Sequence, residues 1–172
     1  KVAQSNYAES WQELKNLALE GHENYLSEAP YSDYKVFEMI NDAIRDIPNL
    51  TLHLSNSTPV RYVQLLGINE KITYHCNRGT SGIDGCTSTA AGWAIADKEG
   101  NVLLITGDMS FVYDSNGLWN NRLPSNLKII IINNQGGGIF RIIQGSDVEE
   151  EKEKFFEAHH PVNIEKLASA FD

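Results

Sequence analysis

Two short polar segments contain the residues best able to bind a metal ion and an anion. Asp108 lies in the segment 106–110, which follows the apolar run 102–105, and Asn134 lies in the segment after the run 128–132. A carboxylate, an amide oxygen and a nearby backbone carbonyl are hard oxygen ligands, which suit Mg²⁺ when phosphate and water complete the octahedron. One acid leaves the cation under-neutralised, so such a site favours an anionic co-ligand. The pattern predicts a magnesium–diphosphate site.

Glycines flank both predicted metal ligands. Gly107 precedes Asp108, while Gly136 and Gly137 closely follow Asn134. Glycine lets the backbone approach a diphosphate closely, and N–H groups at a helix start favour its charge. The alternative is that Asp108 caps a helix and the glycines only turn the chain. The presence of both halves favours the metal site.

The elements around these segments should place them side by side. Both apolar runs have the composition of strands that are buried on both faces. Residues 114–123 between them are predicted to form a helix, with Asp114 or Ser115 as its N-cap. The two strands should then be parallel and joined by a right-handed crossover. The metal ligands would lie just past the carboxyl ends of neighbouring strands, where open α/β sheets bind ligands.

The rest of the chain alternates in the same way. Further strands are predicted at residues 50–54 and 72–76, and helices at 4–26, 34–47, 60–66, 87–96 and 147–157, the last a charged surface helix. This alternation predicts an α/β fold, a three-layer sandwich with a mainly parallel sheet.

Two arginines are candidates for binding carboxylates. Ser57 and Arg61 are four residues apart and share a face near the start of a helix. A helix N-terminus with one guanidinium can receive a carboxylate; the alternative is a capped helix with a solvated arginine. Arg78 lies in the glycine-rich loop 77–85, where it could bind a carboxylate bidentately or form a surface ion pair.

Composition excludes several classes of partner. The net charge of −9, from 23 acidic and 14 basic residues, argues against nucleic acid. No apolar run approaches the ~20 residues of a membrane-spanning helix. Cys76 and Cys86 are expected to be free thiols in a reducing cytoplasm. The usual nucleotide-binding glycine motifs are absent, although a non-catalytic nucleotide-binding or regulatory domain remains an alternative.

The motifs resemble a known family. Gly107-Asp108 with Asn133-Asn134 is similar to the thiamine-diphosphate signature. The Met109-Ser110 variant and the loop 77–85 resemble the MenD family in particular, the 2-succinyl-5-enolpyruvyl-6-hydroxy-3-cyclohexene-1-carboxylate synthases of menaquinone biosynthesis. The resemblance extends from about residue 56 to the end.

This resemblance implies the thiamine-diphosphate-binding fold, with Mg²⁺ or Mn²⁺ beside the cofactor. The metal ligands would be Asp108, Asn134 and the carbonyl of Gly136. The cofactor-binding residues would be Asn56, Ser81, Gly82, Ile83, Gly107, Ser110, Gly137, Gly138 and Ile139, with Ile83 beneath the thiazolium. The substrate-binding residues would be Ser57, Arg61, Arg78 and Phe140. Phe140 could cover the substrate pocket or only anchor its loop.

The resemblance also implies a reaction. Enzymes of this family decarboxylate 2-oxoglutarate and add the product to isochorismate. Their essential glutamate comes from the pyrimidine-binding domain of a second subunit, in a homodimer or homotetramer. No residue here resembles a proton-transfer catalyst, so the isolated chain is expected to be inactive. Another thiamine enzyme, such as an acetolactate synthase or a 2-oxoacid decarboxylase, is the alternative.

Two regions are expected. Residues 1–30 would form an entry helix and linker from a missing upstream region. Residues 31–172 would form the pyrophosphate-binding domain, truncated at its C-terminus. A cytoplasmic location is expected.

Overall fold

A computed structural model describes residues 5–143 and 149–171. The chain divides into two compact units, Lys1–Val36 and Phe37–Asp172. The expected boundary at residues 30 and 31 lies close to this division, and the roles assigned to the two regions stay predictions. No helix among the described residues is long and apolar enough to cross a membrane.

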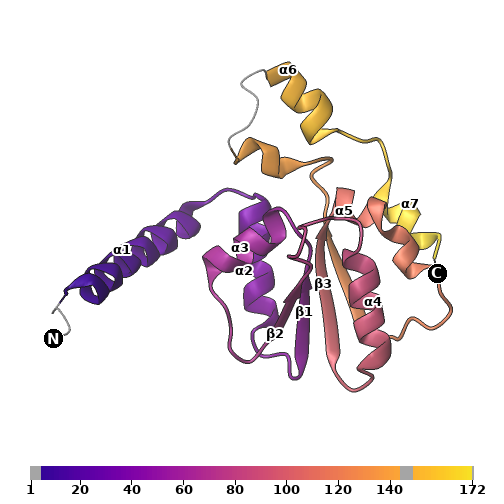
Figure 1. Ribbon diagram of the computed structural model, residues 1–172, viewed down its shortest axis with the longest axis horizontal. Helices are drawn as coiled ribbons and strands as arrows, with labels where there is room; N and C mark the ends of the chain where they lie inside the picture. Colours follow the sequence, from indigo (N-terminus) through magenta and orange to yellow (C-terminus); the bar gives the residue numbers. More distant parts are fainter. Residues whose placement is uncertain (1–4, 144–148, 172) are drawn as a thin grey trace. The chain divides into compact units, whose positions relative to one another are not determined.

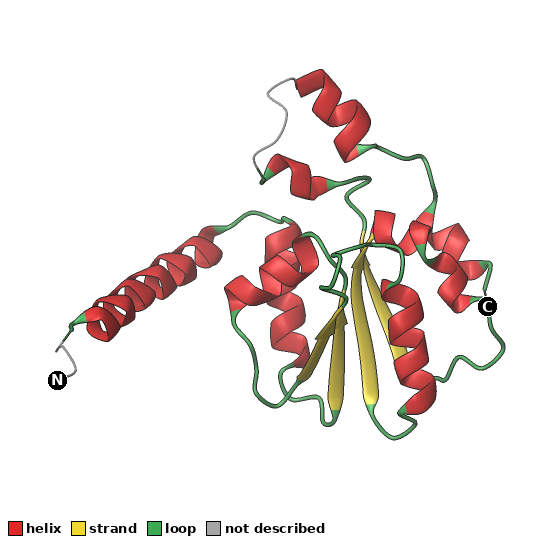
Figure 2. Ribbon diagram, in the orientation of Figure 1, coloured by secondary structure: helices red, strands yellow, loops and turns green. Residues whose placement is uncertain are grey.

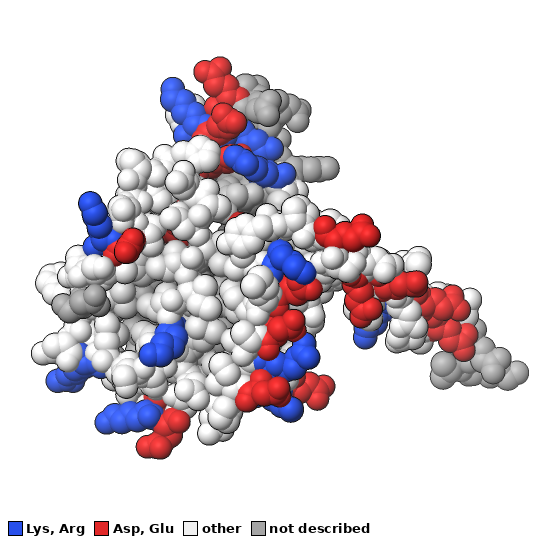
Figure 3. Space-filling model, turned by 180° about the vertical axis from the view of Figure 1, so that it is seen from behind, with Lys and Arg blue, Asp and Glu red and all other residues white. Residues whose placement is uncertain are grey.

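The first unit contains one long helix, α1 (Tyr7–Glu28). Leu26 is its buried residue, whereas Trp11 and Leu14 are more than half exposed. Acidic side chains gather along this helix (Figure 3), in keeping with the glutamates of its sequence. The side chain of His22 is hydrogen-bonded to Tyr34 within the same unit.

Four parallel strands form the sheet of the second unit: β1 (Leu50–Leu54), β2 (Thr73–Cys76), β3 (Asn101–Gly107) and β4 (Leu127–Ile132). Their order is β2-β1-β3-β4 (Figure 1). Leu52 and Leu104, on the two central strands, are almost completely buried. The predicted α/β fold with a parallel sheet is confirmed. The expectation that residues 128–132 are buried on both faces is wrong, because β4 has only one neighbouring strand in the described sheet and most of it is half-buried.

Helices cover both faces of the sheet (Figure 2). The chain passes from β1 to β2 through α3 (Thr58–Leu66) and returns past β1 to β3 through α4 (Cys86–Ala96). Because the two crossovers run in opposite directions and both are right-handed, α3 and α4 lie on opposite faces. Small residues let α4 pack closely on the strands; Ala90 and Ala94 are fully buried. The helix α2 (Asp33–Ile44) buries Phe37, Ile40 and Ile44 as the predicted apolar stripe.

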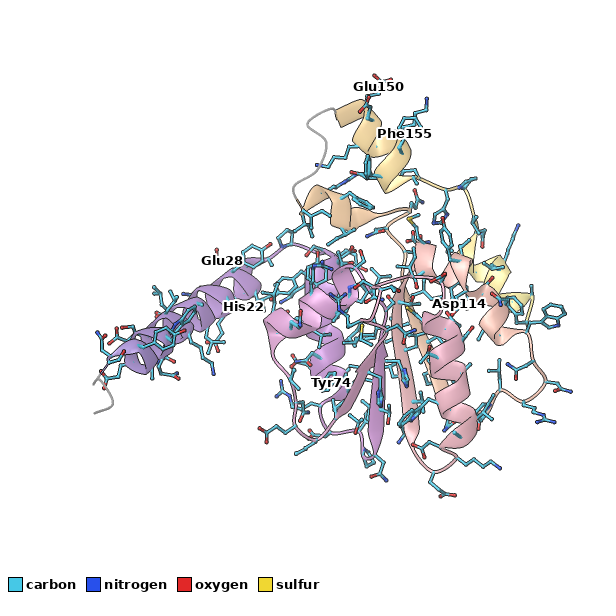
Figure 4. The ribbon with its side chains drawn as sticks, in the orientation of Figure 1. His22, Glu28, Tyr74, Asp114, Glu150 and Phe155 are labelled. Carbon is cyan, nitrogen blue, oxygen red and sulfur yellow. The ribbon has the colours of Figure 1, made fainter. Side chains whose placement is uncertain are left out.

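The predicted helix at residues 114–123 is wrong. The chain forms α5 (Asp108–Tyr113) directly after β3, then a short 3₁₀ helix, η1 (Ser115–Leu118). Asp114 lies at their junction and does not cap η1 with its side chain. Its carboxylate accepts hydrogen bonds of 2.6 Å from both N–H and Oγ of Ser88, in the first turn of α4 (Figure 4). Since α4 has no side-chain cap of its own, Asp114 caps it from a distant part of the chain.

The C-terminal part contains η2 (Gly138–Arg141), α6 (Glu149–Glu151), the π-helix η3 (Lys152–Glu157) and α7 (Ile164–Ser169). The predicted surface helix 147–157 begins outside the described residues. Its solvated character is wrong at Glu157, which is 3% exposed. Both oxygens of Glu157 accept hydrogen bonds from Arg141, at 2.9 and 2.6 Å, and this pairing permits its burial.

Asparagines close the amino end of the sheet. The amide nitrogen of Asn126 donates to the carbonyls of Asp97 and Gly100, both at 2.8 Å. That of Asn101 donates to the carbonyl of Pro48 at 2.9 Å. The turns at this end are thereby tied to one another, and the carboxyl ends of the strands lie at the opposite edge.

Candidate functional site

A cavity of about 310 Å³ lies at the carboxyl ends of the strands. The segments that follow all four strands contribute to its lining. The adjacent strands β1 and β3 leave the sheet with crossovers on opposite faces, which makes this a topological switch point. Every predicted site residue except Gly82 lines the cavity. Five other residues line the cavity that were not predicted as site residues, namely Thr58, Pro59, Met109, Ile132 and Ile143.

The two predicted metal ligands that act through side chains line this same cavity. Gly107 of β3 pairs with Ile132 of β4, so Asp108 and Asn134 follow neighbouring strand ends. Asp108 is 1% exposed. Its Oδ1 accepts a hydrogen bond from the N–H of Met109 at 2.8 Å. No described residue donates a hydrogen bond to its buried Oδ2, although Nε2 of His160 lies 3.2 Å from it. A buried carboxylate oxygen without a donor is costly, and a cation would satisfy it.

A cation here would need neutral oxygen ligands as well. The described residues contain no group of three or more His, Cys, Asp and Glu side chains placed to bind a metal. Asp108 would therefore be joined by oxygens of the amide or carbonyl type, which the segment 134–138 contributes to the cavity. That donor set suits Mg²⁺ or Mn²⁺ rather than Zn²⁺. The ligand roles of Asn134 and Gly136 stay predictions.

The glycines of the site have different surroundings. A Cβ at Gly107 would meet no atom of the described residues within 4 Å, so the cavity is open at this point. A Cβ at Gly136 would lie 2.5 Å from the carbonyl oxygen of Glu157, and one at Gly137 would lie 2.9 Å from that of Phe156. These two glycines make room for the protein's own backbone. Their predicted contact with a diphosphate remains untested.

Backbone strain in the site loops falls on residues other than glycine. Ser57, Ser81 and Gln135 have φ of 79°, 59° and 64°, a region that side chains disfavour. All three stand in segments that follow strand ends, and two of them line the cavity. Such strain persists only where surrounding contacts hold it, and it concentrates at functional sites.

Asn56 organises the glycine-rich loop. This residue is 2% exposed, and its amide nitrogen donates to the carbonyls of Asn77 and Gly82, at 2.7 and 2.6 Å. Its Oδ1 accepts from Nη1 of Arg78 at 2.9 Å. Asn56 therefore ties the loop and one candidate substrate-binding arginine to the end of β1. Gly82 contributes its carbonyl to this network, and its contact with the cofactor stays a prediction.

The helix α5 fixes the other side of that loop. Oγ of Ser110 donates to the carbonyl of Ile83 at 2.8 Å. Asp114, at the other end of α5, holds Ser88 just beyond the loop. The side chain of Ile83 lines the cavity. The loop is consequently held relative to Asp108 by the hydrogen bond of Ser110 within α5 and by those of Asp114, which follows α5.

The ionisable residues that line the cavity are two arginines and one aspartate. Arg61 is exposed and donates to the carbonyl of Ser57 at 2.8 Å, while Arg78 is held by Asn56. The site thus carries positive charge although the whole chain is acidic, which suits an anionic ligand. Burial raises the pKa of the neighbouring Cys76 thiol, against the effect of Arg78, so Cys76 is a poor nucleophile.

Sequence reasoning missed a segment that lies against this site, residues 156–160, which we call the strap. Nε2 of His160 lies 3.2 Å from Oδ2 of Asp108. Hydrogen bonds from Arg141 lower the pKa of Glu157, despite its burial. The only available signal was Pro161, which ends a helical pattern directly after two histidines.

The sequence left open whether Phe140 covers the substrate pocket or only anchors its loop, and its position is compatible with both. It lines the cavity, and its ring also packs edge-on against that of Phe156, with centroids 5.4 Å apart. A contact with the strap therefore anchors the loop that carries Phe140. Its contact with a substrate stays a prediction.

Comparison with known proteins identifies similar chains. Residues 57–172 match the family model of the thiamine pyrophosphate enzyme, C-terminal TPP binding domain. A 2-succinyl-5-enolpyruvyl-6-hydroxy-3-cyclohexene-1-carboxylate synthase of Flavobacterium psychrophilum is 46% identical over 98% of this chain and 30% of its own length. The enzyme of the same name from Flavobacterium johnsoniae is 51% identical over 86% of this chain and 26% of its own length. The one from Desulfotalea psychrophila is 55% identical over 69% of this chain and 22% of its own length. The chain spans less than a third of these relatives.

Proposed function

The chain belongs to the thiamine pyrophosphate enzymes, whose C-terminal TPP-binding domain it contains, and from this premise we propose that its cavity binds the cofactor's diphosphate through Mg²⁺. The observation that carries the proposal is the buried Oδ2 of Asp108, to which no residue in the described part of the chain donates a hydrogen bond. This oxygen belongs to a residue that lines a cavity with two arginines. Asn134 and the carbonyl of Gly136 would complete the protein's share of the ligands. The open space at Gly107 would admit a phosphate.

The protein's own residues would bind and orient the reactants. Ile83, fixed through its carbonyl by Ser110, would support the thiazolium ring. Arg61 and Arg78 would receive substrate carboxylates, since a guanidinium presents several donors to one carboxylate. When bound, thiamine diphosphate supplies the nucleophilic carbon and the electron sink for decarboxylation.

We propose further that the whole protein is a menaquinone-pathway synthase. It would decarboxylate 2-oxoglutarate and join the product to isochorismate, as a homodimer or homotetramer. High identity to synthases of that name over nearly the whole chain supports this assignment. A pyrimidine-binding domain of a second subunit would supply the glutamate that activates the cofactor. The 172-residue chain alone should therefore bind cofactor but not turn over.

Calorimetry tests the cofactor site. Thiamine diphosphate with Mg²⁺ should bind, and ATP and NAD should not. Asp108→Asn should weaken binding of thiamine diphosphate with Mg²⁺ by about tenfold or more, because the cation loses its one charged protein ligand. If the variant binds as tightly as the unaltered protein, Asp108 is not a metal ligand.

Substrate assays test the assignment to this synthase. Consumption of 2-oxoglutarate that depends on isochorismate is expected of the whole protein. Turnover of pyruvate instead would favour an acetolactate synthase or a simple decarboxylase. Turnover by the 172-residue chain alone would contradict the need for a second subunit.

A further inference from the structure

His160 and Asp108 face each other in a buried place. The side chain of Asp108 is 2% exposed and that of His160 is 15% exposed. Their atoms Oδ2 and Nε2 are 3.2 Å apart, close enough for an ion pair but not aligned as a hydrogen bond. Neither atom has a hydrogen-bond partner elsewhere among residues 5–143 and 149–171. An imidazole therefore stands beside the one carboxylate that the cavity offers to a cation.

The strap that carries His160 is fixed to the loop on the other side of the cation site. The N–H of Gly137 donates to the carbonyl of Glu157 at 2.7 Å. Nδ1 of His159 lies 2.8 Å from the carbonyl oxygen of Gln135. The strap thus contacts both the loop that contains Asn134 and, through His160, the carboxylate after β3.

The strap turns sharply at a residue whose conformation is unfavourable. Ala158, between Glu157 and the two histidines, has φ of 47° and ψ of 55°. Such a conformation costs energy for a residue with a side chain, so neighbouring contacts must hold it. The ion pair of Glu157 with Arg141 and the contact of His159 lie on either side of this turn. The turn is what directs His160 toward Asp108.

We propose that His160 is a positioning residue for the cation site: its imidazole holds the carboxylate of Asp108 in the orientation in which that carboxylate binds the cation. A ligating carboxylate usually accepts a hydrogen bond from a partner outside the coordination sphere, which fixes its orientation. The proposal rests on the cation site described under the proposed function.

The test measures binding of Mn²⁺ in the presence of thiamine diphosphate. Binding is detected by electron paramagnetic resonance, as the loss of the signal of the free ion. His160→Leu should weaken Mn²⁺ binding by about 10- to 100-fold. His160→Gln places a donor nitrogen near the position of Nε2 and should recover most of the affinity. His160→Asn is too short to do so and should stay weak. Lys166→Gln, on the exposed surface of α7, is the matched control for a substitution in this segment.

Each other result overturns the proposal. Tighter binding by His160→Leu would mean that the imidazole occupies the place of the cation. Unchanged binding, or equal losses in the Leu and Gln variants, would mean that His160 only packs. The midpoint of thermal unfolding without cation shows whether His160→Leu folds. If it does not fold, the Mn²⁺ affinities of His160→Gln and His160→Asn decide whether the proposal holds. If the unaltered protein binds no Mn²⁺, the proposed cation site is wrong, and the role proposed for His160 is wrong with it.

Discussion

His53 should make the protein sensitive to acid. It lies on β1, is 3% exposed, and stacks on His75 of β2 with ring centroids 5.1 Å apart. Trp93 of α4 contacts the ring of His53 edge-on and lies tilted against the ring of His75. Burial, with a smaller contribution from His75, lowers the pKa of His53 from 6.5 to about 4. The unfolded chain therefore binds a proton more readily than the folded chain at pH values between these two.

The size of the effect follows from this difference in pKa. Stability conferred by neutral His53 is complete above about pH 6.5 and is lost as the pH falls toward 4. The loss should reach roughly 2 kcal/mol near pH 5 and about 3 kcal/mol near pH 4. His53→Leu removes the titrating group and keeps an apolar side chain of similar volume. Its stability should fall less on acidification than that of the unaltered protein, by these amounts.

Urea unfolding at a series of pH values between about 4 and 7.5 measures the difference. Comparing the two proteins at each pH removes the contributions of carboxylates and histidines that lie far from the substituted residue. Parallel curves for His53→Leu and the unaltered protein would refute the reasoning. That result would mean that the folded protein accepts a proton at His53 without loss.

Three further changes have defined outcomes. Asp114→Ala removes the acceptor for both Ser88 groups and should cost roughly 2 kcal/mol in urea unfolding, with Asp114→Asn recovering part of it; equal stability of all three would contradict the distant cap. Gly136→Ala would place a Cβ 2.5 Å from the carbonyl oxygen of Glu157. This variant should displace the strap and weaken Mn²⁺ binding, as measured by electron paramagnetic resonance. In Gly107→Ala the new Cβ would meet open space, so the free energy of unfolding without ligand should stay unchanged. Arg78→Lys keeps the charge but loses bidentate geometry, so it should raise the KM of the whole protein for 2-oxoglutarate more than it lowers kcat; an unchanged KM would remove Arg78 from the substrate site.

The sheet and the place of the site could be predicted from the sequence because each strand has a strong local pattern. Residues 50–54 form β1 as predicted, and the run before Asn134 forms β4. The crossover rule then places Asp108 and Asn134 on neighbouring strand ends without knowledge of any distant contact.

The errors arose where a distant contact decides the structure. Asp114 resembles a local helix cap, but its carboxylate binds Ser88, which only the folded chain brings near. Glu157 belongs to a charged sequence and is buried because Arg141 pairs with it. His160 gave only a weak signal, the proline that follows His159 and His160, and this proline does not indicate a contact with Asp108. Non-local pairing of this kind is invisible to periodicity.

A label or linker can be attached at the amino end of the sheet without contact with the cavity at the carboxyl end. Asn126 and Asn101 tie together turns that contribute nothing to the cavity, and Lys98 and Glu99 project from one of them. A fluorophore or a surface linker attached at residue 98 would leave the ligand-binding edge facing bulk solution. Immobilised in that single orientation, the protein could report cofactor and cation binding by surface-sensitive optics, without interference from the attachment.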